Sequence, residues 1–271
     1  MPASRSASRV TERPRSARRW PLILVALLVL IAAAIFVLPA SLAARFLPAQ
    51  VHAEDFSGSF LHGAAGKISV NARDAGAIEW QVHPLALLRL ALVVDVHWVK
   101  LGFVIDGTAD VDVRSGARGV VARGIRGGGP IDDLTDLGFA NGWRGGAQLN
   151  LTEIKSDLHT LQSAVGKIEV SDVASASVAD GSNLGSYVLT LAPGSVAPDG
   201  TLSATVNDSG GPVEAQVQIR FSPATRTGML SGTLKERPEA SPALRNQLNN
   251  LAQLRPRDSS GRFPVDLEFT F

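Results

Sequence analysis

Four stretches of the chain alternate apolar and polar residues with a period of two. Between residues 90 and 98, for example, Val94 and Val96 alternate with Asp95. Successive side chains of a β-strand point to opposite faces, so this pattern predicts strands with one buried face. It recurs at residues 103–113, 213–221 and 263–271, and weaker alternation predicts strands at residues 65–71, 77–82, 118–125, 146–153, 164–171, 184–191, 200–206 and 227–234.

Short turn sequences separate the predicted strands, which favours antiparallel pairing of neighbours. These turns are rich in glycine and proline, as at residues 127–130 and 198–200. A sheet with one apolar and one charged face must curl or be covered. The sequence therefore predicts a mainly β fold with a curved, mostly antiparallel sheet. It leaves open whether the strands form a sandwich or a half-open barrel.

One or two short helices are predicted within this β-rich part. Ser241 is a suitable N-cap, Pro242 fits the first helical position, and leucines recur on one face, which predicts a helix over residues 241–254. Shorter helical turns are predicted at residues 83–88, where a proline can open the turn, and at residues 131–137.

The alternation is absent near the start of the chain, where residues 21–38 form one apolar run. From Pro21 to Leu38, with Leu22, Leu30 and Phe36 between them, no side chain is charged. As a helix this run would be roughly 27 Å long, close to the thickness of the hydrocarbon core of a bilayer. The sequence therefore predicts a membrane-spanning anchor at residues 21–38.

Basic residues ahead of the anchor set its predicted orientation. The tail before it contains Arg13, Arg15, Arg18 and Arg19, and cytoplasmic ends of spans carry such an excess of positive charge. The rest of the chain would then lie in the periplasm. The predicted organisation is a basic cytoplasmic tail (1–20), a transmembrane signal-anchor helix (21–38), a juxtamembrane connector (39–54) and a periplasmic β domain (55–271).

A cleavable signal peptide is the alternative to a permanent anchor. Small residues at Ser41 and Ala43 offer a cleavage site, but the apolar run is longer than the usual 7–15-residue core of a signal peptide. Whether the segment is cleaved therefore stays open at this point.

The charge of the chain is concentrated in its tail. Residues 1–20 carry six basic and one acidic side chain, which leaves 20 basic and 24 acidic side chains in the remainder. The predicted periplasmic domain is mildly acidic, so nucleic acid is not an expected partner. Because the chain has no cysteine, disulfides and thiolate metal sites are excluded.

The residue patterns do not point to catalysis. The five histidines, at positions 52, 62, 83, 97 and 159, have no metal-ligand spacing. The acidic run at residues 132–136 fits a solvated helix start better than a magnesium site. The glycine-rich residues 124–129 match no phosphate-binding fingerprint, and no Gly-x-Ser-x-Gly motif occurs. We therefore expect no enzyme, no catalytic residue, no metal or cofactor site and no small-molecule substrate.

Two segments one hundred residues apart resemble each other. Residues 64–70 and 164–170 agree at five of seven positions. This is compatible with a sheet built from two similar halves, and equally with two glycine-containing strand entries that look alike.

A series of short motifs resembles one protein family. Residues 78–88 fit the W-x-φ-x-P-x-x-L-L segment of type II secretion system protein N, where φ is an apolar residue. Residues 184–187, 208–213 and 258–264 resemble later landmarks of that family, in the same order. The resemblance covers nearly all of residues 20–271.

This resemblance implies a non-catalytic component of the Gram-negative type II secretion apparatus, held in the inner membrane by a single span. Such a protein would help to assemble or link the inner-membrane platform and the outer-membrane secretin. The implied partners are other inner-membrane subunits of the apparatus, with the secretin as a further candidate. The resemblance brings no catalytic residue with it.

The alternation also supports a second hypothesis. An apolar-lined sheet held at the membrane could bind an acyl chain, as a periplasmic lipid-binding or lipid-transport protein does. The two hypotheses differ in whether the inner face of the sheet is filled by its own side chains or leaves an open groove.

Overall fold

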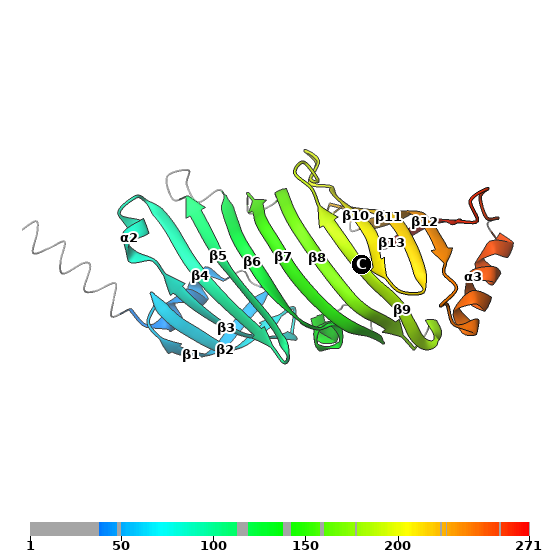
Figure 1. Ribbon diagram of the computed structural model, residues 1–271. Helices are drawn as coiled ribbons and strands as arrows, with labels where there is room; N and C mark the ends of the chain where they lie inside the picture. Colours follow the sequence, from blue (N-terminus) through cyan, green and yellow to red (C-terminus); the bar gives the residue numbers. More distant parts are fainter. Residues whose placement is uncertain are drawn as a thin grey trace, which may run out of the picture.

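The computed structural model describes residues 38–47, 50–112, 119–137, 142–157, 160–176, 178–222, 224–225, 227–254 and 256–270. Within these residues thirteen strands form one twisted sheet, in which every strand pairs antiparallel with the next one in the sequence (Figure 1). The strands are β1 (Val51–Gly58), β2 (His62–Val70), β3 (Arg73–Val82), β4 (Ala91–Lys100), β5 (Phe103–Asp112), β6 (Val120–Pro130), β7 (Trp143–Ser156), β8 (Leu161–Ser175), β9 (Val178–Leu191), β10 (Leu202–Gly210), β11 (Val213–Ser222), β12 (Thr227–Glu236) and β13 (Phe263–Thr270).

This arrangement excludes the sandwich, one of the two architectures that the sequence left open. The described strands do not divide into two packed layers, so they form no sandwich. The sheet is also not closed, because its order runs from β1 at one edge to β13 at the other. The prediction of a mainly β, antiparallel fold is confirmed.

The twelve predicted strands all correspond to strands of the sheet, and β1 is the one that was missed. It begins at Val51, inside the range predicted for the connector. Asp55 has a φ of 57°, and the register passes from Glu54 opposite Lys67 directly to Phe56 opposite Ala65. This irregularity breaks the alternation by which a strand is recognised.

The predicted helical segments are confirmed. α3 (Pro242–Leu254) begins after Ser241, whose hydroxyl accepts a hydrogen bond from the Leu244 N–H at 3.2 Å. α2 (Pro84–Leu87) and the 3-10 helix η3 (Ile131–Leu137) occupy the two predicted helical turns. A further 3-10 helix, η2 (Ala40–Phe46), precedes the first strand.

The two similar segments found in the sequence lie in β2 and β8. The strands between them pair without interruption, and the order of the sheet marks no boundary between two halves.

Helix α3 covers the largest apolar cluster of the described residues. Leu244 and Leu248 of this helix are buried against Leu184, Val213 and Phe263 from three different strands. A second cluster centres on Leu151 and Leu191, which lie farther along the sheet. Since the sheet is a single layer, each of its two faces is a candidate binding surface.

Candidate functional site

The residues predicted to anchor the chain lie almost entirely outside the described part. Pro21, Leu22, Leu30 and Phe36 are not described, and Leu38 is the first described residue, with 37% of its surface exposed. The basic residues predicted to set the topology, Arg13, Arg15, Arg18 and Arg19, also lie outside the description. Among the helices that are described, none has the length and apolar character needed to cross a bilayer.

The strand register places one apolar residue or glycine from every strand in a single line across the sheet. We call this line the apolar row: Phe56, Ala65, Ile78, Trp98, Ile105, Gly127, Leu149, Ile168, Leu189, Val206, Val217, Gly232 and Val265, each directly opposite the next. With strands about 4.8 Å apart, the row is about 58 Å long. Most of its side chains are half-buried.

The neighbouring residue on each strand forms a second line, which points to the opposite face. This polar row consists of Ser57, Ala64, Glu79, His97, Asp106, Arg126, Asn150, Lys167, Thr190, Thr205, Gln218, Ser231 and Asp266. Twelve of its thirteen residues are polar, and most are exposed. The alternation in individual strands therefore adds up to one apolar and one polar face over the whole sheet.

Three aromatic residues on the apolar face have hydrogen-bonded polar atoms. The Trp80 indole N–H donates to the Phe60 carbonyl at 2.9 Å, and that of Trp98 donates to the Ala75 carbonyl at 2.7 Å. The Tyr187 hydroxyl donates to the Leu184 carbonyl at 2.6 Å. Burial, assisted by the nearby Asp208 carboxylate, raises the pKa of Tyr187 to about 12. These side chains consequently present carbon to the apolar face.

The helices that the structure describes cover only parts of the apolar face. At its β1 end, η2 packs on β1 and β2, where Ala40 lies against Gly63, the residue opposite Trp80. At one rim, η3 contacts β3, β5, β6 and β7. At the β13 end, α3 packs on Phe263, which shares its face with Val265 of the apolar row.

The buried Lys100 side chain connects η3 to the sheet by polar contacts. Its side chain is 1% exposed, and its ammonium donates to the Asp74 carbonyl at 2.8 Å. The carboxylates of Asp74 and Asp136 lie 3.6 and 3.5 Å from the same nitrogen. In addition, Asp133 accepts a hydrogen bond from the Gly102 N–H at 2.7 Å. The acidic run of η3 is therefore used for structural contacts.

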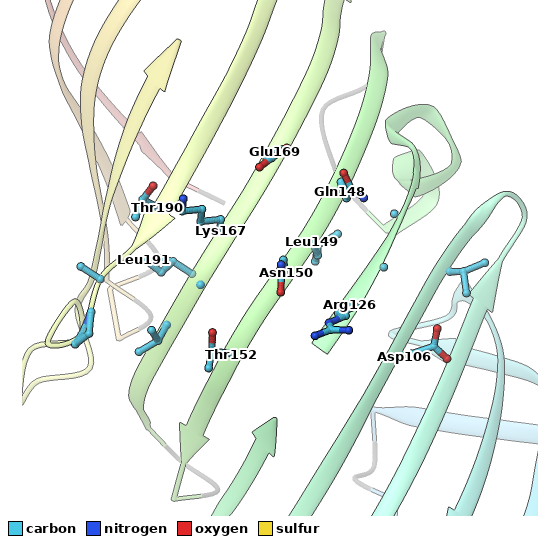
Figure 2. A pocket seen from close by; sticks show the side chains of 17 residues that line it. Asp106, Arg126, Gln148, Leu149, Asn150, Thr152, Lys167, Glu169, Thr190 and Leu191 are labelled. Carbon is cyan, nitrogen blue, oxygen red and sulfur yellow. The ribbon is translucent and has the colours of Figure 1, made fainter. Parts of the chain in front are cut away.

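The polar face has an open hollow of about 830 Å³ over the middle of the sheet. Figure 2 shows Asp106, Arg126, Asn150, Lys167 and Glu169 along it, contributed by four strands. Side chains of both charges lie along this surface. Within the described residues no group of three His, Asp or Glu side chains could hold a metal ion. The hollow is suited to polar contacts.

Two histidines that are separate in the sequence meet carboxylates on this face. His83 Nε2 lies 2.6 Å from Asp95 Oδ2, and His97 Nδ1 lies 2.6 Å from Asp106 Oδ1. Asp95 also accepts a hydrogen bond from the Thr108 hydroxyl at 2.8 Å. The Thr108 hydrogen bond, followed by the one to His83, lowers the pKa of Asp95.

Sequence reasoning missed both rows and both His–Asp pairs, because they depend on which residues of different strands stand opposite each other. The alternation of apolar and polar positions within each strand was the only sequence pattern related to the rows. It gives the face of a residue but not its cross-strand partners.

A comparison with protein families matches residues 49–266 to the model of type II secretion system (T2SS) protein N. No curated protein and no solved structure matches the chain. The family match spans the sheet from β1 into β13 and includes both faces. The chain therefore belongs to the type II secretion system protein N family.

Proposed function

We propose that this protein is a non-catalytic component of the type II secretion apparatus, anchored in the inner membrane by residues 21–38 with its sheet in the periplasm. The family match over residues 49–266 is the observation that carries the proposal. The apolar run and the arginines before it support the anchor and its orientation. The work of such a subunit is contact with other subunits, which helps to assemble or link the inner-membrane platform and the outer-membrane secretin.

The open edges of the sheet are the surfaces best suited to this contact. An edge strand presents unpaired backbone groups that can add a strand from another protein. β1 is a poor template because of its irregularity at Asp55, whereas β13 pairs with β12 through eight consecutive residues without a shift. Leu267 on β13 is 58% exposed. A partner strand added beside β13 would cover this side chain.

The proposal is tested by crosslinking in living cells. A photoreactive amino acid is placed at position 267, and a control is placed at position 101, an exposed leucine in the β4–β5 turn away from both edges. We expect position 267 to trap inner-membrane subunits of the secretion apparatus or its secretin, and position 101 to trap none of them. The edge assignment fails if both positions give the same products.

A probe within residues 21–38 separates the edge from the anchor. Adducts with inner-membrane secretion subunits from this segment would support the anchored component even if position 267 gave none. Recovery of lipid alone from the segment, together with an inert edge, would contradict the proposal.

A further inference from the structure

Along its middle, the apolar row is not covered by a helix or a second sheet of the described residues. The described helices contact the apolar face over β1 and β2, along one rim, and near β13. At the opposite rim, residues 192–201 bring Val196 onto the second apolar cluster. Between them, Ile105, Ile168 and Leu189 are half-buried. An apolar sheet face of this length normally packs on something.

The chemistry of the apolar row restricts which ligand can cover it. Its residues are aliphatic or aromatic side chains and glycines, and the two indole N–H groups nearby are already bonded to backbone carbonyls. A ligand lying on the row would therefore find no hydrogen-bond partner. Only a ligand without hydrogen-bonding groups can be buried there without cost.

An extended peptide does not meet this condition. The row runs across the strands, so a peptide laid along it has no strand edge to pair with and would bury its N–H and C=O groups unsatisfied. A second copy packed face to face does not fit either. Packed sheets are about 10 Å apart, and η2, η3 and α3 already occupy the layer above this face.

We propose that the apolar row binds the acyl chains of phospholipids. The chains lie along the row between the helices, and the headgroups remain in water. Lys100, Arg237 and Arg257 near this face are each paired with carboxylates, so the row is expected to show little headgroup selectivity. We favour membrane phospholipid as the source of these acyl chains. The predicted anchor ends at Leu38, immediately before η2, and would place the β1 end of the row beside the bilayer.

The test uses the full-length chain in phosphatidylcholine vesicles that contain a little phosphatidylcholine with a diazirine at the end of one acyl chain. After irradiation and digestion, mass spectrometry locates the adducts. We expect adducts on β4 to β11 as well as on residues 21–38. Adducts confined to residues 21–38 would overturn the proposal, whatever the variants described next do.

Leu189 and Thr190 provide a matched pair of variants, because they are neighbours in β9 on opposite faces. L189E places a charge in the apolar row, and T190E places one on the polar face. We expect L189E to lower the adducts on the sheet at least fivefold, with those on residues 21–38 unchanged, and T190E to change neither. Equal losses in both variants, or a stable dimer without sheet adducts, would contradict lipid binding. These lipid adducts are measured in vesicles, so the result is independent of whether the protein acts in secretion.

Discussion

Replacing the buried Lys100 separates the contribution of its charge from that of its hydrocarbon stem. The side chain is almost fully buried, while the carboxylates of Asp74 and Asp136 are 59% and 67% exposed. When K100M removes the ammonium, both carboxylates stay hydrated, so no buried charge is left unpaired. The main loss is the charged hydrogen bond to the Asp74 carbonyl, which contributes about 1.5–3 kcal/mol. The Met chain keeps most of the packing.

K100A removes the stem as well. Three further methylene groups at about 0.8 kcal/mol each add roughly 2.4 kcal/mol, so the total loss is about 4–5 kcal/mol. Urea unfolding followed by circular dichroism measures both variants. With a slope of about 3 kcal/mol per molar urea, K100M should lower the midpoint by about 0.5–1 M and K100A by about 1.5 M.

Two results would refute this reasoning. If K100M were as stable as the native chain, the cost of desolvating the ammonium would cancel its hydrogen bond and ion pairs. If K100A lost less than about 1 kcal/mol, the stem of Lys100 would not be packed as described.

Three further predictions concern a leucine of α3 and two side chains of the sheet. Truncating the buried Leu248 to alanine should cost about 2–5 kcal/mol in the free energy of unfolding, whereas the exposed Asn246→Ala control should change it by less than about 0.5 kcal/mol. Tyr187, the only tyrosine, should titrate at about 12 when its absorbance is followed near 295 nm, and its contribution to stability should be lost as pH rises from 10 towards 12. A pKa near 10 in the folded protein would contradict its burial. Thr108→Val should destabilise the fold by about 1 kcal/mol above pH 4, since Asp95 is half exposed. Because the pKa of Asp95 is lowered from 3.8, this difference should fade as pH drops below that value, and a constant difference would argue against the hydrogen bond.

The strands and their buried faces could be predicted because the pattern lies within each strand. In β4, the parity of Val94, Val96 and Trp98 was sufficient to identify the strand and its apolar face. The helix at residues 241–254 was equally local, since its N-cap and its apolar spacing are both contained in the segment.

The rows could not be predicted because they depend on β-bulges. Asp106 stands opposite Arg126, but Thr108 stands opposite Arg123, so β6 contains one residue more than β5. Gly124, with a φ of 60°, lies in this extra length. Without it, counting on from the Thr108–Arg123 pair, Arg126 instead of Gly127 would stand opposite Ile105 and the apolar row would be interrupted. The turn predicted at residues 127–130 was wrong for a different reason: these residues belong to β6, and its glycines are needed because a Cβ at Gly127, Gly128 or Gly129 would meet neighbouring backbone atoms.

The pairing of distant side chains was equally hidden. His97 and Asp106 are nine residues apart and belong to different strands, so the histidine spacing suggested no partner. Lys100 is a charged residue at the end of β4, and its burial depends on the position of η3 over the rim. Contacts of this kind are fixed by tertiary structure, not by local sequence.

The most direct test of the central proposal is a deletion of the gene in its own host, complemented by the native chain or by an empty vector. Extracellular and periplasmic enzymes are compared, and entry of a hydrophobic dye reports on the outer-membrane barrier. A secretion component predicts that folded exoenzymes accumulate in the periplasm while the barrier stays intact, and that the native chain restores secretion. Normal secretion in the deletion strain would contradict the proposed role.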